Sequence, residues 1–150
     1  MITSPSPVYP WPIGVGPRYH PAARGPVAHC TSGGRSFQVH IELFAQRKVV
    51  IVPAGIGTCH DPVRTTAPTG VVHVSPERRS TLGDLFRVWG RRLASDAMLS
   101  FRGRVSVFVG GRRWRGEPRR VPLTKHAQVV VEIGGYVAPH STYLFPKGAG

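Results

Sequence analysis

The stretch STLGDLFRVWGRRL at residues 80–93 decides the fold, because no other segment of the chain has a clear helical period. Thr81 and Asp84 have the spacing of a capping box, in which each side chain accepts an N–H group at the start of the helix. Gly90 suits the left-handed conformation that ends a helix. A helix of about two turns is unstable alone, so we expect its apolar stripe to pack on a sheet. The stripe consists of Leu82, Leu85, Phe86 and Trp89.

The first strand of that sheet is predicted at residues 37–45, FQVHIELFA. Its apolar and polar side chains alternate, which is typical of a half-buried strand with one face on the core. The opposite face carries Gln38, His40 and Glu42, so we expect these side chains to be polar surface.

The other apolar runs predict the remaining strands and their connections. Gly110 and Gly111 are a strong hairpin signal, because a type I′ turn needs positive φ at both central residues. Residues 53–69 are expected to be loop, and residues 94–104 are expected to be a linker. The predicted strands are residues 48–52, 70–74, 105–109, 112–115 and 127–133, of which the last is continuous and therefore central.

These elements predict one α+β domain, with a mixed sheet of about five strands and one short helix. Residues 1–36 hold seven prolines and predict an extended arm, residues 37–135 form the core, and residues 136–150 form a C-terminal extension. The arms are rich in aromatic groups for linkers, so we expect them to pack on the core or on a partner. The aromatic residues in question are Tyr9, Trp11, Tyr143 and Phe145.

Hairpin, short strand, helix and two further strands is the element order of a β-grasp domain, and VFVGGRRWRG with VPLTKHAQVVVEIG resembles its closing strands. More narrowly, IELFAQRKVVIVPAGIG, PTGVVHV, TLGDLFRVWG and PHSTYLFP resemble a group of small uncharacterised bacterial proteins, some of them exported or lipid-anchored. Some members carry His-x-His on the first strand and His-Thr-His near the third, so the resemblance implies an exported metal-binding protein as one alternative. In this chain His40 stands alone, and Arg64-Thr65-Thr66 occupies the second position.

The two cysteines, Cys30 and Cys59, each have a histidine beside them, His29 and His60. Together the four could ligate zinc, but adjacent residues of an extended chain point to opposite sides, so this set is a weak candidate. A disulfide that pins the arm to the loop after residue 52 and a pair of buried free thiols are the stronger alternatives.

Charge is the most distinctive property of the composition: 20 Lys and Arg against 7 Asp and Glu give a net charge of +13. Residues 78–120 contain twelve arginines and three acids, a net +9. This excess indicates either an anion-facing surface or a coding bias toward arginine. The candidate binding residues are Arg91, Arg92, Arg112, Arg113, Trp114, Arg115, Arg119 and Arg120.

No nucleophile motif, phosphate-cradling loop or pair of neighbouring acids occurs, so no catalytic residue and no cofactor is predicted and an enzyme is not expected. The chain has no apolar run of membrane-spanning length and no signal peptide, which favours the cytoplasm, with the cell envelope as the alternative. The preferred function is a non-enzymatic interaction module that docks onto a protein assembly through its proline-rich arms and Arg-rich face. The alternative is a protein that binds nucleic acid or an anionic surface.

Overall fold

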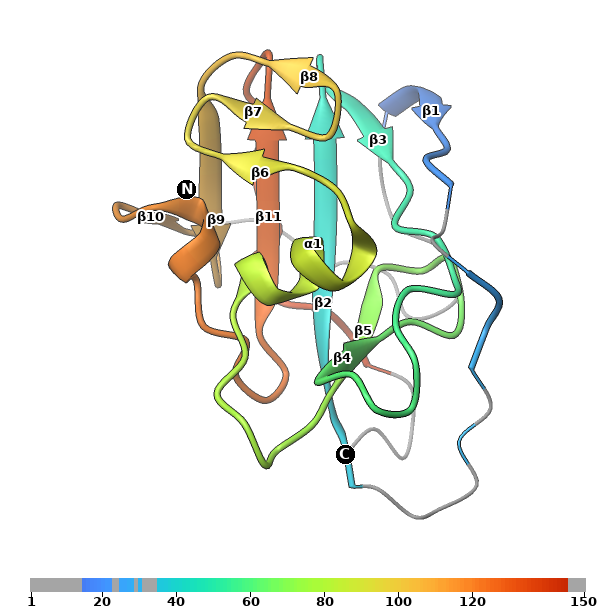
Figure 1. The fold of residues 1–150 in the computed structure, drawn as a ribbon. Coiled ribbons are helices and arrows are strands. Elements are labelled where there is room, and N and C mark those ends of the chain that lie inside the picture. The colour runs from blue at the N-terminus through green and yellow to red at the C-terminus, as the bar shows by residue number, and fades with distance from the viewer. Residues whose placement is uncertain (1–14, 23–24, 29, 31–34, 146–150) are drawn as a thin grey trace.

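The computed structural model describes residues 15–22, 25–28, 30 and 35–145, and its fold is α+β. In this part of the chain α1 (Leu82–Trp89) lies in front of an eight-stranded mixed sheet, next to a second, three-stranded sheet (Figure 1). The large sheet contains β1 (Val15–Tyr19), β2 (Phe37–Ala45), β3 (Lys48–Val50), β4 (Val63–Arg64), β5 (Val71–Val74), β9 (Val105–Val109), β10 (Arg112–Trp114) and β11 (Gln128–Ile133). The small sheet contains β6 (Leu93–Ala94), β7 (Ala97–Met98) and β8 (Phe101–Arg102), and the 3-10 helix η1 (Pro118–Arg120) precedes β11.

Strands β2 and β11 form the centre of the large sheet as a parallel pair. β3 adds to β2 and β9 adds to β11, each antiparallel, and the outer strands β1 and β10 follow on the two sides. β5 pairs with the first half of β2 and with β4. The prediction of about five strands is therefore too low, because β1 comes from the proline-rich arm and β4 is only two residues long. The prediction that residues 127–133 form a central strand is confirmed.

The predicted helix and its caps are confirmed. The Thr81 hydroxyl accepts from the Asp84 N–H at 3.3 Å, and the Thr81 N–H donates to the Asp84 carboxylate at 2.8 Å. Gly90 ends the helix with a φ of 78°. Leu82, Leu85 and the other stripe residues are buried against the odd-numbered side chains of β2 and β11. Each such burial stabilises the fold by about 2 kcal/mol, so tertiary packing rather than helix propensity maintains this short helix.

The prediction of a linker at residues 94–104 is wrong, because this segment forms most of the small sheet. Its strands pair in order β6-β7-β8, and they bury Leu93 and Met98 against the main core. Leu99 adopts a positive φ of 56° at the turn between β7 and β8. Strands of two residues are too short to show an alternating pattern, so periodicity alone does not reveal them.

The second face of the sheet is also covered, so the prediction that β2 is half-buried is wrong. His40 is fully buried and Glu42 is 3% exposed, in contrast to the polar surface expected from the alternation. A second apolar cluster on this face is joined by Val137, which belongs to the chain that follows β11. We call residues 136–145 the C-terminal strap, because they fold back across this face. The cluster consists of Phe44, Val49, Ile51, Phe108 and Val130.

The described parts of both arms pack on the core. β1 pairs in parallel with β3, and the carbonyl of Ala22 accepts from Trp89 Nε1 at 3.1 Å. Tyr143 is buried, and Phe145 stacks on the ring of His126, so the prediction that these two aromatics pack is confirmed. The other two predicted contacts, Tyr9 and Trp11, lie outside the described residues. Within the described residues, no helix is both long enough and apolar enough to cross a membrane.

Candidate functional site

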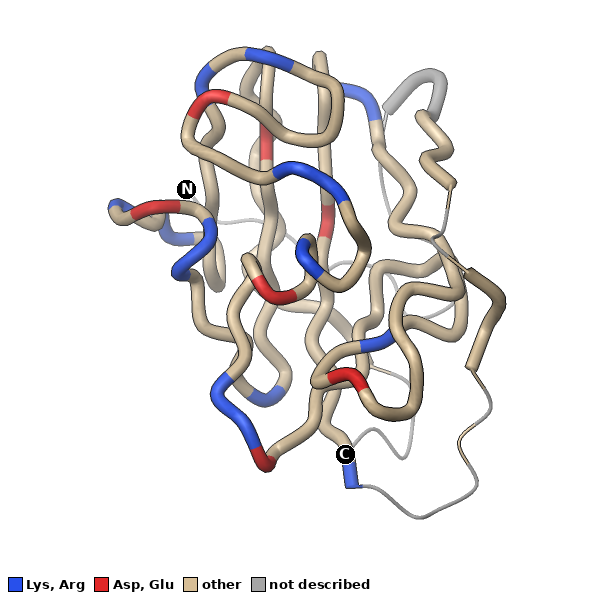
Figure 2. The backbone as a smooth tube through the Cα atoms, in the orientation of Figure 1, with Lys and Arg blue, Asp and Glu red and all other residues tan. Residues whose placement is uncertain are grey.

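The seven arginines proposed from sequence as a binding cluster are all exposed. With Trp114 they form what we call the Arg-rich face, although they come from three places in the fold. Figure 2 shows one basic stretch just after α1 and others at the β10 and η1 edge. Its arginines are Arg91 and Arg92 after α1, Arg112, Arg113 and Arg115 on or after β10, and Arg119 and Arg120 on η1.

Packing of η1 against α1 and β6 brings part of this face together. The guanidinium of Arg119 donates to the carbonyls of Leu93 at 3.5 Å and Gly83 at 3.3 Å. These hydrogen bonds hold η1 against α1, so the guanidinium of Arg119 is only partly available to a partner. Arg120 lies 3.8 Å from the carboxylate of Glu117, an exposed ion pair of little energetic weight.

Trp114 has a structural role that limits its use as a contact residue. Its indole Nε1 donates to the carbonyl of Glu117 at 3.0 Å, and the ring packs against the core. A Cβ at Gly116 would lie 3.2 Å from the indole nitrogen, so the backbone there covers the ring closely. Trp114 is therefore half-buried, unlike the exposed arginines around it.

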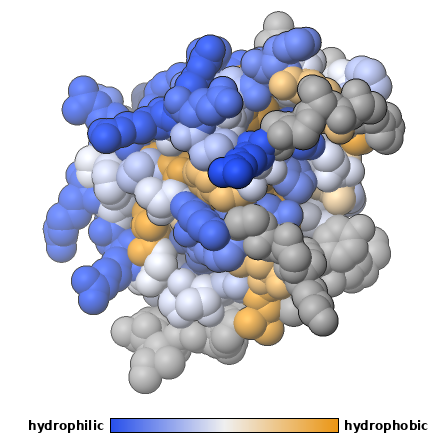
Figure 3. Space-filling model, turned by 90° about the horizontal axis from the view of Figure 1, so that it is seen from below, coloured by the Kyte–Doolittle hydropathy of each residue, from blue (hydrophilic) through white to orange (hydrophobic). Residues whose placement is uncertain are grey.

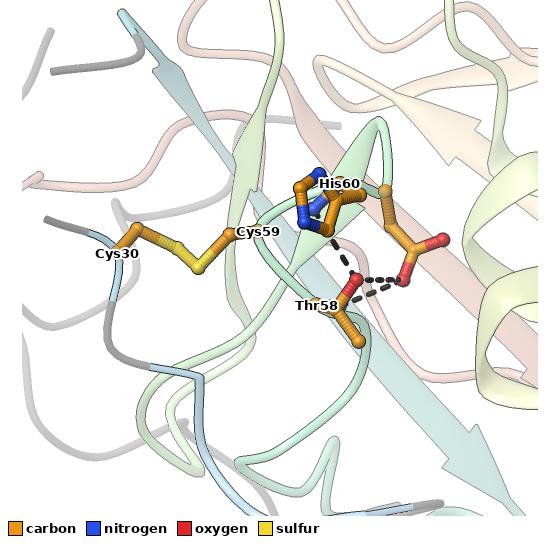
Figure 4. Close-up of a disulfide and its surroundings, with 5 residues drawn as sticks. Cys30, Thr58, Cys59 and His60 are labelled. Carbon is orange, nitrogen blue, oxygen red and sulfur yellow. Dashed lines mark hydrogen bonds between the residues drawn. A yellow bond between two sulfur atoms is a disulfide. The ribbon is translucent and has the colours of Figure 1, made fainter. Parts of the chain in front are cut away.

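Cys30 and Cys59 form a disulfide, as Figure 4 shows. Their Cα atoms lie 5.5 Å apart across a separation of 29 residues, so the disulfide is the one of the two stronger alternatives that the structure contains. The alternative of two free thiols is excluded for this state of the protein. The bridge ties the N-terminal segment to the loop after β3.

The loop that carries Cys59 is fixed by hydrogen bonds of its own (Figure 4). Thr58 donates to the Asp61 carboxylate from its N–H at 2.7 Å and from its hydroxyl at 3.0 Å. The weak zinc candidate does not fit this arrangement, because both sulfur atoms are used in the disulfide and His60 is exposed. The fourth member, His29, lies outside the described residues. In the described ranges, no three or more His, Cys, Asp or Glu residues gather into a possible metal site.

A buried polar network under the C-terminal strap is the feature that sequence reasoning missed. His40 Nδ1 lies 2.7 Å from Gln128 Oε1, and His40 Nε2 lies 2.9 Å from the carbonyl of Thr69. The amide nitrogen of Gln128 donates to the carboxylate of Glu42. The sequence places His40 and Glu42 on the same side of one strand, which is a signal for part of this network. Gln128 joins them only because β11 pairs with β2, which the sequence does not show.

The strap completes this network and closes it. His140 Nδ1 lies 3.0 and 3.2 Å from the two carboxylate oxygens of Glu42, and the ring of Tyr143 stacks on His40 at 3.6 Å. The hydrogen bond to Glu42 raises the pKa of His140, although burial opposes this. Burial lowers the pKa of His40, although Glu42 and Gln128 oppose this. The pKa values of the two histidines are therefore shifted in opposite directions, so His140 is protonated at a higher pH than His40.

Glu132 is a second buried acid on this face. One carboxylate oxygen accepts from the N–H of Val137 at 3.0 Å, whereas the other has no hydrogen-bond partner in the described part of the chain. Burial, together with the nearby charge of Glu42, raises the pKa of Glu132 to about 7. The contacts of Glu42 with His140 and of Glu132 with the Val137 N–H hold the strap against the sheet.

Comparison with known protein families, with curated proteins and with solved structures finds no match to this chain.

Proposed function

We propose that this protein is a non-enzymatic interaction module that docks onto an acidic protein assembly through its Arg-rich face. The observation that carries the proposal is the shortage of acids beside the exposed arginines. In the described residues, arginine makes two ion pairs, Arg87 with Asp84 and Arg120 with Glu117. Arg112, Arg113 and Arg115 take part in neither, so their forked donors remain available for carboxylates of a partner.

The arms support a narrower version of the idea than the sequence suggested. In the described residues both arms cover the protein's own core, through β1 on one side and the strap on the other. We therefore assign docking to the Arg-rich face, and we assign these parts of the arms to stability. The absence of enzymatic activity is part of the proposal, and its support is that His40 is buried beneath the ring of Tyr143 and that Glu42, which contacts it, is also buried.

A β-grasp-like core is also part of the proposal. Its support is the arrangement of a hairpin β2–β3, a helix α1 across the sheet, and a last strand β11 that returns in parallel beside β2. The resemblance of IELFAQRKVVIVPAGIG and TLGDLFRVWG to small uncharacterised bacterial proteins, some exported, is consistent with the disulfide, because disulfides persist mainly in oxidising compartments.

The partner class favoured by the geometry is a protein rather than a nucleic acid. Binding of single strands without sequence preference uses aromatic rings as stacking platforms. Trp114, the aromatic group within the basic cluster, is half-buried and donates its indole N–H to the protein itself. A protein contact needs only the exposed arginines around it.

The test compares two triple variants that lose the same charge. Arg112, Arg113 and Arg115 are replaced together by glutamine, and the control replaces Arg47, Arg102 and Arg104, which are also exposed. Binding of an acidic peptide and of a DNA oligonucleotide is measured over a range of salt. We expect the first variant to bind the acidic peptide at least about tenfold more weakly and the control to change little.

Equal losses in the two variants would show that net charge alone attracts the peptide, and the proposal would then fail. Tighter binding of the oligonucleotide, with an affinity that falls steeply as salt rises, would assign the face to nucleic acid instead.

A further inference from the structure

A polar cleft of about 540 Å³ lies away from the Arg-rich face and shares no residue with it. Its walls come from the disulfide, the loop after Cys59, the β4–β5 hairpin and the segment before α1. The volume is in the range of sites that hold small molecules. Figure 3 looks onto the lower side of the molecule, where these loops lie, and shows hydrophilic residues around a few hydrophobic ones.

The charged side chains of this cleft are mostly cationic. Arg35, Arg64 and Arg78 line it, whereas its acids are Asp61 and Glu77. Asp61 is already engaged, because one of its oxygens accepts both the N–H and the hydroxyl of Thr58. Glu77 is exposed to solvent, as are Arg35 and Arg78, so water screens all three of these charges. Three arginines against two acids leave a net charge of +1 among the lining residues, and Arg64 is the least exposed of the arginines.

Arg64 is the best placed of these arginines. It stands directly opposite His73 in the antiparallel pairing of β4 with β5, and both side chains are half-buried. His73 Nε2 lies 3.3 Å from the hydroxyl of Thr66. Burial, with a further contribution from Arg64, lowers the pKa of His73, so the ring is neutral near pH 7. A neutral imidazole beside a guanidinium adds a hydrogen-bonding group without a second charge.

We propose that this cleft binds a small ligand through an oxyanion group, which can be a phosphate ester, a sulfate ester or a carboxylate. Arg64 supplies the forked donor and the charge, and Arg35 and Arg78 add positive potential at the rim. The partial burial of Arg64 reduces screening by water, so its attraction to a bound oxyanion is stronger than that of an exposed arginine. The disulfide holds one wall in place and reduces the ordering cost of binding.

The experiment follows backbone amide signals of the oxidised full-length protein by NMR at low salt. Inorganic phosphate, sulfate, phenyl phosphate and citrate are added separately. We expect saturable shifts in β4 and β5, and a tighter response to the organic ligands than to the inorganic ions. A preference for phenyl phosphate identifies an ester ligand, and a preference for citrate identifies a carboxylate ligand.

Arg64→Gln is expected to weaken binding by about tenfold or more, whereas the control Arg102→Gln, on β8, should bind as the parent does. Arg78→Gln serves as a second variant, because its exposed side chain can be changed without disturbing the fold. Absence of saturable shifts in the parent overturns the proposal. Equal affinity in the parent and in folded Arg64→Gln or Arg78→Gln overturns it as well.

Discussion

Replacing Glu132 by glutamine should stabilise the protein, although the change alters a side chain that accepts a native hydrogen bond. Glu132 is 2% exposed on the strap side of β11. Glutamine keeps a carbonyl oxygen to accept from the Val137 N–H, and its amide nitrogen takes the place of an oxygen that already lacks a partner. The main difference between the two side chains is therefore the buried charge.

The size and sign of the effect follow from the pKa. Burial raises the pKa of Glu132 from its ordinary 4.5 to about 7. Each pKa unit corresponds to about 1.4 kcal/mol, so ionising this carboxyl costs about 3 kcal/mol more in the folded protein than in the unfolded chain. The Glu132 carboxyl keeps its proton to a higher pH in the folded state than in the unfolded chain. The free energy of unfolding therefore falls as the pH rises from 4.5 to about 7, and the full loss applies above that range.

The assay is denaturant unfolding followed by tryptophan fluorescence, with the disulfide intact. We expect Glu132→Gln to raise the free energy of unfolding by up to about 3 kcal/mol near pH 8 and by little near pH 4.5. Glu117→Gln is the matched control, because Glu117 is exposed and its weak ion pair contributes little at either pH. An equal or lower stability of Glu132→Gln near pH 8 would refute the reasoning.

Three further predictions concern packing, the disulfide and the strap. Gly83→Ala should lower stability by about 1 to 3 kcal/mol in thermal unfolding, because the new Cβ would lie 2.8 Å from the carbonyl oxygen of Arg119 and this clash outweighs the better helix propensity. Cys59→Ser should cost about 3.5 kcal/mol for a loop of 29 residues, measured by urea unfolding, and a similar loss on reduction of the parent should accompany it. His140→Ala should lower the free energy of unfolding by about 1 to 2 kcal/mol below pH 6.5, where the ring of His140 is charged and attracts Glu42. Above the raised pKa of His140 the ring is neutral, so the loss should be smaller there. A loss of stability that does not change with pH would contradict this.

Local patterns predict the elements whose signals are contained within a few residues. The helix at residues 80–93 follows from a capping box, a stripe and a glycine stop, and each of these appears in the structure. The hairpin at Gly110 and Gly111 follows in the same way, since both adopt the positive φ that the turn requires. These signals depend on backbone geometry that does not change with the rest of the fold.

Features that depend on distant segments could not be read from the same patterns. The strap covers β2 only because residues after β11 fold back across the sheet. The alternation in residues 37–45 carries no sign of this cover, so it predicts a solvent-exposed face. The small sheet was not predicted for a different reason, because strands of two residues carry too few side chains to show a period. The parallel register of β2 with β11 likewise has no local signature.

The candidate sites also differ in whether their signals are local in the sequence or depend on distant segments. The disulfide was one of the alternatives that the sequence left open, because two cysteines allow a single intramolecular pairing but do not show whether they are oxidised. The basic cluster was visible as composition, but its division between β10, η1 and the segment after α1 is a property of the fold. The cleft around Arg64 was not predicted, since its basic residues are scattered between positions 35 and 78.

The central position of β11 also determines the order in which the chain can reach its fold. His40 and Gln128 contact each other across a separation of 88 residues, and β11 is the last of the described strands to be synthesised. Until it arrives, the β2–β3 hairpin has an open edge that can pair with other chains. Both cysteines precede β11, so oxidation can link residue 30 to residue 59 before the sheet closes. The nascent chain is therefore most exposed to misassembly between the synthesis of β3 and that of β11.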